Sequence, residues 1–578
     1  MRALALLLCL LSAQAWGACG SECWVDLTGT GTGAATGTSA SNQCAGTADA
    51  DCTPVAGTTS TVYYCGQRTT ALTLTVGGTT AVPLTYNFKS GDAACGDASI
   101  VIASGAALTL NSTITNSGVR ATTLYYPTLR SSSGAALFIS GADDVLIDHA
   151  SITNNGSTSG AVTCSASTLS TNIDFQYPTI TGSAANGIHC LPTGASLAWN
   201  DWTIEYGTIT DNIGYGIRLT QESTGFTTSS WNRIKIRYNT ISRNGTTVAT
   251  PAGAVFVRNC DSAITSDTCA SDGNRGVGIE VAYNTVEDNG YRTGVDPNGS
   301  ASLNINGFKN ARIHHNTLRR NTVSGGSISS LKNTASWIHD NDIHTTYSAN
   351  GIDGAGIYVD RYTDSTDVFS NFIEDCALAD DVHSEGAGVA LFRATNNKVF
   401  GNIIRDCRMG VFWGGTVTAS NHFSNNDIAD CPNNTSFNGA GIFETAGEAV
   451  SSPAAAVLAY NNSVTGCYYG ITGSDDLAAY GNNNYYNVTT ARNGQTTGSG
   501  TDTADNPAYA GGTSPSTAAG FCLTDDSPLL AAGTYLGAWA TGYAGHDLGK
   551  PPAIGARGLC NARRAVTSRR AISGSRAP

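Results

Sequence analysis

The sequence predicts an all-β solenoid, a parallel β-helix in which one short unit is stacked many times. The first observation is a four-residue phrase centred on asparagine, such as Tyr238-Asn-Thr-Ile241, which recurs every 21 to 45 residues. A fixed phrase with variable spacers is typical of repeated coils whose insertions are confined to loops. The asparagines that anchor the phrase are Asn239, Asn284, Asn316, Asn341, Asn371, Asn402, Asn426, Asn462 and Asn483.

The second observation is an alternation of apolar residues around each anchor. Since side chains alternate between the two faces of a strand, these residues predict two columns that point into the interior. The column three residues before the anchor contains Ile236, Val281, Ile313, Ile338, Val368, Val399 and Phe423. The column two residues after it contains Ile241, Val286, Leu318, Ile343, Ile373, Ile404, Ile428 and Val464. Many coils continue with a second strand opened by glycine, such as Gly356-Ile-Tyr-Val359.

The third observation is the composition of the 578 residues. Only 13% are charged, 67 are glycine, and no stretch after the first residues has the apolar period of a long amphipathic helix. Short apolar alternations separated by Gly and Asn favour strands and turns. The net charge of −13 argues against nucleic acid as a partner.

The first element, residues 1–18, is predicted to be a secretory signal peptide. Arg2 precedes the apolar run Ala3–Leu11, and small residues follow as a cleavage region. No later segment has the roughly 18 apolar residues of a membrane span. Of the 17 cysteines, removal of Cys9 leaves an even sixteen for an oxidising compartment. We therefore expect a secreted, extracellular protein, with the periplasm or the cell surface as alternatives.

The elements that follow are an N-terminal cap over residues 19–99, β-helix coils over 100–495, a closing segment over 496–560 and a basic disordered tail over 561–578. The cap is expected because an open solenoid end exposes core and unpaired backbone. A small ligand-binding module is the alternative for this segment. Its cysteines are Cys19, Cys23, Cys44, Cys52, Cys65 and Cys95.

A further column lies five residues after the anchor and changes from asparagine to cysteine along the chain. Asparagine tolerates left-handed backbone at a corner, and stacked amides can bond one another. Stacked strands lie about 4.8 Å apart, within disulfide reach, so Cys376–Cys407 and Cys431–Cys467 are predicted pairs. An unbonded cysteine stack is the alternative. The column contains Asn212, Asn244, Asn289, Asn321, Cys376, Cys407, Cys431 and Cys467. Cys164–Cys190, Cys260–Cys269 and Cys522–Cys560 are further expected pairs.

These phrases and the glycine-opened strands resemble the pectin-lyase-like proteins with a right-handed parallel β-helix. The resemblance covers roughly residues 100–500. It implies a right-handed parallel β-helix, here with a disulfide-rich N-terminal cap. The superfamily includes polysaccharide lyases, glycoside hydrolases, uronate epimerases, phage tailspikes and surface adhesins, so the resemblance does not select one function.

Two outward rows are candidates for binding a polysaccharide. The basic residues Lys309, Lys332, Arg361 and Arg393 precede the anchors of four consecutive coils, and stacked like charges require an anionic neighbour or full solvation. A uronic acid polymer would suit them, whereas neutralisation by nearby acids such as Asp360 and Asp364 is the alternative. The aromatic row contains Phe256, Tyr358, Phe412 and Phe443. It suits sugar stacking, or else covers the strand beneath a loop.

The residues between 340 and 408 are unusually rich in ionisable groups, and two long loops there are natural places for a site. The candidate catalytic residues are Asp353, Asp360, Arg361, His383, Glu385 and Arg393. Paired carboxylates would serve a glycoside hydrolase, whereas carboxylates with arginine would serve a lyase that neutralises a uronate. Candidate substrate-binding residues are Lys309, Lys332, Tyr358, Phe412 and Arg405, although Arg405 also suits a ladder ion pair with Glu374 or Asp375.

Metal ligands are expected in two places. Calcium would be the natural cofactor of a lyase, with Asp364, Asp380 and Asp381 as its candidate ligands. His314 and His339 share one outward position in adjacent coils, and with His344 or Asp340 they could bind a metal or simply be solvated. The sequence thus predicts a secreted β-helix protein that cleaves an acidic polysaccharide as a lyase or glycoside hydrolase. The alternative is a non-catalytic adhesin or surface protein that binds one.

Overall fold

The computed structural model describes most of the predicted coils. The described residues are 21–28, 54–79, 81–89, 95, 97–111, 114, 121–156, 160–164, 170–191, 199–220, 231–245, 252–259, 275–290, 301–323, 325–348, 354–376, 386–414, 421–433, 438–444, 457–473, 477–494, 501–534 and 553–556. The predicted signal peptide and the basic tail lie outside these residues. The chain divides into unit 1, residues 1–312 and 321–323, and unit 2, residues 313–320 and 324–578.

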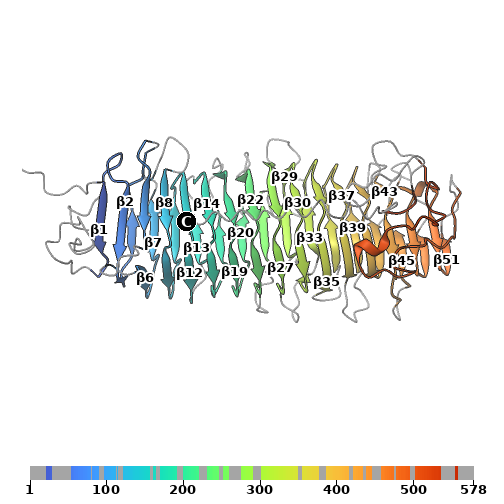
Figure 1. The fold of residues 1–578 in the computed structure, drawn as a ribbon, viewed down its shortest axis with the longest axis horizontal. Coiled ribbons are helices and arrows are strands. Elements are labelled where there is room, and N and C mark those ends of the chain that lie inside the picture. Colours follow the sequence, from blue (N-terminus) through green and yellow to red (C-terminus); the bar gives the residue numbers. More distant parts are fainter. Residues whose placement is uncertain are drawn as a thin grey trace, which may run out of the picture. The chain divides into compact units, whose positions relative to one another are not determined.

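Each unit is a right-handed parallel β-helix, which confirms the predicted fold class. From β2 onward, each turn of the chain, here called a coil, contributes one strand to each of three parallel sheets, in the order sheet 1, sheet 2, sheet 3. Successive strands of a sheet lie side by side within each unit (Figure 1). No helix in the described part of the chain is long and apolar enough to span a bilayer.

The strands of unit 1 fall into these three sheets and a few short extra pairs. Sheet 1 contains β1 (Glu22–Asp26), β2 (Thr61–Cys65), β5 (Leu84–Asn87), β8 (Thr122–Tyr125), β11 (Val145–Asp148), β14 (Ile173–Gln176), β18 (Thr203–Glu205), β22 (Ile234–Arg237) and β26 (Ile279–Ala282). Sheet 2 contains β3 (Gln67–Arg68), β6 (Ser99–Ile102), β9 (Thr128–Ser131), β12 (Ser151–Asn154), β15 (Thr179–Thr181), β19 (Thr208–Thr210), β23 (Thr240–Ser242) and β27 (Thr285–Glu287). Sheet 3 contains β4 (Leu72–Leu74), β7 (Leu108–Asn111), β10 (Leu137–Ser140), β13 (Val162–Cys164), β16 (Ile188–Cys190), β20 (Ile217–Thr220), β24 (Val255–Arg258) and β28 (Leu303–Asn306). The short strands are β17 (Trp199–Asn200) with β21 (Trp231–Asn232), β25 (Gly276–Val277) with β29 (Phe308–Lys309), and β32 (Thr322–Val323).

Unit 2 repeats the same arrangement. Sheet 1 contains β30 (Arg312–His314), β34 (Trp337–His339), β37 (Asp367–Phe369), β40 (Lys398–Phe400), β43 (His422–Ser424), β46 (Val457–Tyr460) and β49 (Leu477–Gly481). Sheet 2 contains β31 (Thr317–Arg319), β35 (Asp342–Ser348), β38 (Phe372–Cys376), β41 (Ile403–Cys407), β44 (Asp427–Ala429), β47 (Ser463–Thr465) and β50 (Asn484–Tyr486). Sheet 3 contains β33 (Gly326–Leu331), β36 (Ala355–Val359), β39 (Ala387–Phe392), β42 (Met409–Gly414), β45 (Ala440–Glu444), β48 (Tyr469–Thr472) and β51 (Thr490–Asn493). The 3₁₀-helix η2 (Ala518–Phe521) follows.

The predicted interior columns are present in both units. Ile241 pairs in register with Val286 in unit 1, and Leu318 pairs with Ile343 in unit 2. All four side chains are fully buried. At about 25 cal/mol per Å² of buried apolar surface, these stacked aliphatic columns are the main source of stability for the coil.

The anchoring asparagines form buried ladders between the interior columns. In unit 2 the Asn341 side-chain amide donates to Asn371 Oδ1 at 3.0 Å and to the Ile313 carbonyl at 2.9 Å. Unit 1 repeats this pattern, with Asn239 donating to Asn284 Oδ1 at 3.0 Å. Each amide therefore satisfies backbone groups at a corner and the amide of the next coil. This explains why asparagine recurs at the position.

The predicted reason for asparagine at the corner is half correct. In the column five residues after the anchor, Asn212 and Asn244 do bond one another, at 2.8 Å. The left-handed residue, however, is the one before each asparagine: Asp211 has φ of 59° and Arg243 has φ of 52°. The asparagines occupy their positions because of their buried hydrogen bonds rather than their tolerance of left-handed backbone.

Disulfides connect neighbouring coils as the cysteine column predicted. Cys376–Cys407 and Cys431–Cys467 are bonded with Cα atoms 4.6 Å apart, and Cys164–Cys190 is bonded at 4.8 Å. Cys522 is disulfide-bonded, but its expected partner Cys560 lies outside the described residues, as do Cys260 and Cys269.

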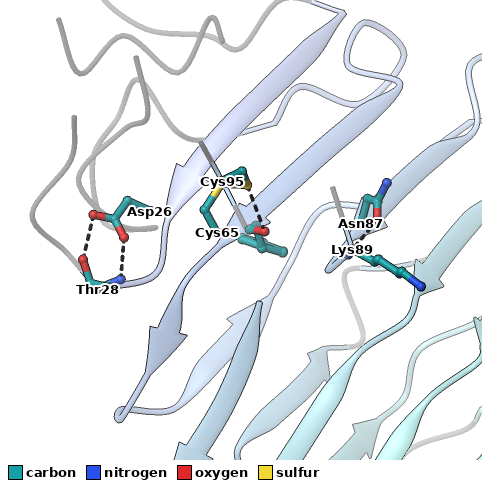
Figure 2. The surroundings of a disulfide bond; sticks show 7 residues. Asp26, Thr28, Cys65, Asn87, Lys89 and Cys95 are labelled. Carbon is teal, nitrogen blue, oxygen red and sulfur yellow. Dashed lines mark hydrogen bonds between the residues drawn. A yellow bond between two sulfur atoms is a disulfide. The ribbon is translucent and has the colours of Figure 1, made fainter. Parts of the chain in front are cut away.

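The segment 19–99 contributes strands to all three sheets of unit 1. Strand β1 pairs in parallel with β2, and the Cys65–Cys95 disulfide lies beside this pair (Figure 2). Close to it, Asp26 accepts hydrogen bonds from the Thr28 backbone and hydroxyl. These strands are consistent with coverage of the first coil, and the role of the segment as a cap stays a prediction.

The closing segment packs against the outer face of sheet 2 in unit 2. Tyr509 donates to the buried carboxylate of Asp427 at 2.7 Å, and the Ala556 backbone donates to the same carboxylate at 3.0 Å. Apolar residues of the segment pack on one outward side chain of each of β38, β41 and β44. The cluster contains Phe372, Ile403, Ala429, Tyr509, Phe521, Leu523, Leu529, Ala553, Ile554 and Ala556.

Candidate functional site

A groove of about 400 Å³ lies on the outer face of sheet 1 in unit 2. Four of its side chains come from the first position of four successive strands, β34, β37, β40 and β43. They are Trp337, Asp367, Lys398 and His422. Register pairs Trp337 with Asp367, Asp367 with Lys398, and Lys398 with His422, so the four side chains form one column.

Local sequence explains why these side chains point outward. The residue after each of them belongs to the buried interior column, as with Val368 after Asp367, and strand alternation therefore sends the groove residue to the opposite face. The corners before β34, β37 and β40 contribute Ala335, Ser365 and Asn396 to the groove. The backbone of these residues is left-handed, with φ of 49°, 53° and 56°. Small side chains at two of these corners leave room for the groove.

The charged groups of the groove influence one another. Lys398 Nζ lies 3.7 Å from the Asp367 carboxylate. Burial raises the pKa of Asp367, and the Lys398 ammonium partly offsets this rise. Burial lowers the pKa of the His422 imidazole, and the nearby Lys398 charge lowers it further. The groove therefore combines an amine, a carboxyl group and an imidazole whose neutral form is favoured, beside an indole ring.

This set of groups suits chemistry on an anionic sugar. An ammonium group can pair with a substrate carboxylate, a neutral imidazole can accept a proton, and an indole face can stack on a sugar ring. Asp367 is the one carboxylic acid among the described residues that line the groove. Glycoside hydrolysis with two carboxylates is therefore less well served here than proton abstraction.

Three of the predicted catalytic residues meet at the corner that follows sheet 3 in unit 2. Asp360 Oδ1 accepts a hydrogen bond of 2.6 Å from the Arg361 backbone and lies 3.8 Å from the Arg361 guanidinium. Arg361 and Arg393 each lie 5.2 Å from the centre of the Phe392 ring. Burial raises the pKa of Asp360, while the Arg361 backbone hydrogen bond and the two guanidinium groups oppose the rise. Asp353, His383 and Glu385 lie outside the described residues.

The predicted binding residues are distributed over several places. Lys332 is only 2% exposed, at the same corner, where its backbone N–H donates to the Arg361 carbonyl. Tyr358 is half-buried, whereas Phe412, two coils later in the same column, is 2% exposed and stacks on Phe443. This column is therefore packed rather than open, as expected of a covered strand. Lys309 belongs to unit 1.

Arg405 is held by protein groups on the outer face of sheet 2. Its guanidinium lies 3.9 Å from Glu374, contacts Asp406 and donates to the Pro515 carbonyl at 3.2 Å. The predicted ladder ion pair with Glu374 is thus present. Glu374 also contacts His344, which bonds Asp342 at 2.6 Å. Although burial lowers the pKa of His344, these two carboxylates raise it to about 9.

The predicted calcium ligands are only partly described. Asp364 accepts hydrogen bonds from Thr395 and Asn396 in the next coil, at 2.9 and 2.7 Å, while Asp380 and Asp381 lie outside the described residues. Within the described ranges, the one group of three metal-ligating side chains in mutual reach is His315, His339 and Asp340.

The sequence contains a signal for the groove that is distinct from the charged loops. Trp337, Asp367, Lys398 and His422 each stand four residues before an anchoring asparagine. Aligning the coils on the anchor places an indole, an acid, a base and an imidazole in one outward column. Attention to loops favoured residues 346–388 instead.

Comparisons with known proteins found matches among solved structures alone. No protein-family model and no curated protein sequence matches this chain. Among solved structures, the pectate lyase Pel9A is 11% identical, with 94% of this chain and 98% of that chain covered at a TM-score of 0.29. The Streptococcus pneumoniae surface adhesin PfbA is 13% identical, covering 63% and 83% at 0.34. The A-module of the Azotobacter vinelandii mannuronan C-5 epimerase AlgE4 is 12% identical, covering 77% and 91% at 0.30.

Proposed function

We propose that the protein is a secreted, carbohydrate-active β-helix protein that cleaves an acidic polysaccharide by β-elimination in the sheet 1 groove of unit 2. The observation that carries the proposal is the column Trp337, Asp367, Lys398 and His422 on four successive rungs of one groove. Rungs about 4.8 Å apart approach the rise per sugar of an extended polysaccharide, so successive sugars would meet successive side chains. The disulfides between coils support an oxidising, extracellular location.

The groove residues have distinct roles in this proposal. Lys398 pairs with the uronate carboxylate and stabilises the charge that develops when the neighbouring carbon loses its proton. The neutral His422 imidazole accepts the C5 proton. The C4–O4 bond then breaks, a C4=C5 double bond forms, and O4 takes a proton from solvent. Asp367 positions Lys398, and Trp337 stacks on a neighbouring sugar.

The corner that contains Asp360, Arg361 and Arg393 is the second place where this chemistry could be located, together with the predicted Asp353, His383 and Glu385. Its two guanidinium groups beside a half-buried carboxylate would suit a uronate equally well in charge. The sheet 1 groove is preferred because its hollow of about 400 Å³ brings an indole, an amine, a carboxyl group and an imidazole into one column. A calcium ion held by Asp364, Asp380 and Asp381 is also proposed, and the cleavage assay described next tests it by comparing activity with and without calcium.

The experiment is a cleavage assay of the mature protein on polygalacturonate, alginate and a neutral glycan, with and without calcium. Ultraviolet absorbance from unsaturated uronate is expected on an acidic polymer and not on the neutral one. His422→Phe should abolish it, whereas Arg393→Gln should leave most of it if the groove is the site. New reducing ends without that absorbance would show a hydrolase instead.

Binding without cleavage is the outcome that would favour the adhesin-like alternative. The same Trp337 and Lys398 side chains would then bind an acidic glycan as a non-catalytic surface. Affinity electrophoresis in gels that contain each polymer separates the two cases. Retardation by alginate or pectate with no product would overturn the enzyme proposal, and neither binding nor product would overturn both.

A further inference from the structure

His315, His339 and Asp340 form a cluster of metal-ligating side chains beside the groove in unit 2. Each offers a ligand atom, and these atoms lie within 4.8 Å of one another. His339 ends strand β34, and Trp337 precedes it by two residues on the same outward face. His315 is exposed, whereas His339 and Asp340 are half-buried. The cluster thus lies at the surface, where an ion from solvent can reach it.

The ring of His339 is held in place from both sides. It stacks on His314 at 4.9 Å with an interplanar angle of 9° and on Phe369 at 4.7 Å with an angle of 8°. Its Nδ1 lies 2.8 Å from Asp340 Oδ2. A stacked ring loses little further freedom when it binds a ligand, so the ordering cost of metal binding is reduced.

His315 and Asp340 occupy one left-handed corner position in adjacent coils. Their φ angles are 54° and 52°, and the His315 backbone donates to the His339 carbonyl at 3.3 Å. His314 Nδ1 lies 2.9 Å from His315 Nδ1, which orients the His315 ring. Such contacts to the second nitrogen are typical of histidines that bind metals. The sequence predicted that His314 and His339 lie near each other, and their rings do stack. The ligand group, however, contains His315 in place of His314.

We propose that His315, His339 and Asp340 bind a divalent transition metal ion of the Zn²⁺ type. Two imidazole nitrogens and one carboxylate oxygen match the ligands of Zn²⁺, Ni²⁺ and Cu²⁺, whereas calcium prefers oxygen ligands throughout. Ligands about 2.0–2.1 Å from a tetrahedral ion lie about 3.4 Å apart. The widest separation in the cluster, at most 4.8 Å, must therefore close by up to about 1.4 Å, and the 2.8 Å between His339 Nδ1 and Asp340 Oδ2 must widen. Three protein ligands leave a fourth position for water. The proposal is independent of any catalytic role of the groove.

The repeat supplies variants that remove ligands and preserve packing. His339→Phe keeps the ring stack, because Phe369 and Phe400 continue the same column in the next coils. Asp340→Asn keeps the left-handed backbone, because Asn425 and Asn461 have φ of 53° and 57° at the same position. His149→Tyr in unit 1 is the matched control. His149 also lies beside an acid, Asp148, but stacks between tyrosines without a second histidine.

The experiment is isothermal titration of the chelator-stripped full-length protein with ZnCl₂, repeated with CaCl₂. The wild type and His149→Tyr should bind one more equivalent of Zn²⁺ than His339→Phe or Asp340→Asn, or bind it at least about tenfold more tightly. Calcium should not compete, and Co²⁺ should give a visible absorption band that His339→Phe lacks. Equal Zn²⁺ binding by wild type and His339→Phe, or no Zn²⁺ binding by the wild type, would overturn the proposal. Neither result depends on whether the protein cleaves a polysaccharide.

Discussion

The corner residue just before the anchor position has the same left-handed backbone in both units but very different chemistry. The anchor position is asparagine in most coils and Ala150, Pro178 or Gly207 in three early coils of unit 1. In unit 1 the corner residue is a ring in five successive coils, each stacked on the next with centroids 4.6 to 5.1 Å apart: His149, Tyr177, Tyr206, Tyr238 and Tyr283. In unit 2 the position contains His315, Asp340, Ser370, Gly401, Asn425 and Asn461. Stacking accounts for the first series. The second series changes from coil to coil, and two of its members belong to the proposed metal site.

The outer charges of both units pair from coil to coil, but the pair in the sheet 1 groove of unit 2 has different surroundings. In unit 1 they pair from coil to coil, as in Arg233 with Asp201 at 2.7 Å and Arg243 with Asp211 at 2.6 Å. Such exposed pairs contribute at most about 1 kcal/mol and need no function. In unit 2, Lys398 and Asp367 are partly buried in a groove beside His422. A repeated pattern thus indicates structure, and a break in the pattern indicates a site.

The largest expected effect is a difference in cleavage rate between substitutions of two lysines that occupy the same position of the coil, one in each unit. Lys398→Met should lower the rate of elimination by about 10² to 10³, because the charge that neutralises the substrate carboxylate is lost. Lys235, which is exposed on β22 of unit 1, also stands four residues before an anchoring asparagine. Initial rates on the polymer that the wild type cleaves give the comparison.

Lys235→Met is the matched control, and it should retain full activity. Unfolding midpoints of both variants would show that neither change acts through stability. Equal loss of activity in the two variants would mean that general attraction of the anionic polymer, rather than the groove, limits the rate.

Substitutions of interior asparagines should lower the stability of the two units by similar amounts. Asn402 donates to Asn426 Oδ1 at 3.0 Å and to the Val368 carbonyl at 2.9 Å, and Asn239 makes the corresponding bonds in unit 1. Asn402→Ala and Asn239→Ala should each cost about 2–3 kcal/mol, because buried groups of the neighbouring coils lose their partners. Urea unfolding measures this, with the exposed Thr240→Ala as a nearly neutral reference. A cost confined to one unit would contradict a common interior.

Sequence alone predicted the coil because its interior rules are local and repeated. Columns such as Ile404 and Ile428, and pairs such as Cys376–Cys407, follow from counting residues relative to one asparagine. The groove could not be predicted with the same ease. Its hollow depends on small corner residues such as Ala335, and the low pKa of His422 depends on burial that sequence does not display. The sequence pointed to the Asp360 corner because charge density is visible along the chain and depth is not.

A smaller effect should appear as a pH dependence that originates on the outer face of sheet 2 in unit 2. The pKa of His344 is raised to about 9 by Asp342 and Glu374 despite burial, against 6.5 for an ordinary histidine. A raised native pKa means that the stabilisation is complete below pH 6.5 and is lost as the pH rises toward 9. We expect a loss of about 1–2 kcal/mol over this range, given partial solvent screening.

His344→Ala should remove the dependence of stability on pH in this range. Alanine is compatible with this position, because Ala429 occupies it in a later coil of the same column. Thermal midpoints between pH 6 and 9.5 provide the measurement. Because the pKa of His422 is lowered, this residue changes its charge below pH 6.5. It therefore does not contribute to the change in stability between pH 6.5 and 9. A wild-type curve as flat as that of His344→Ala would show that the His344 contacts with Asp342 and Glu374 contribute nothing.

The smallest expected effect tests whether the rings of unit 1 are structural. Tyr206 stacks between Tyr177 at 5.1 Å and Tyr238 at 5.0 Å and is 46% exposed. Tyr206→Ala should cost about 1 kcal/mol, since two stacked pairs are lost, and Tyr206→Phe almost nothing. Tyr206→Gly should recover part of the loss because φ of 57° is unfavourable for any residue with a Cβ. Glycan cleavage should be unchanged in all three variants. If Tyr206→Phe instead abolished binding to an acidic glycan, the hydroxyl row would be a binding surface, and repetition would no longer separate structure from function.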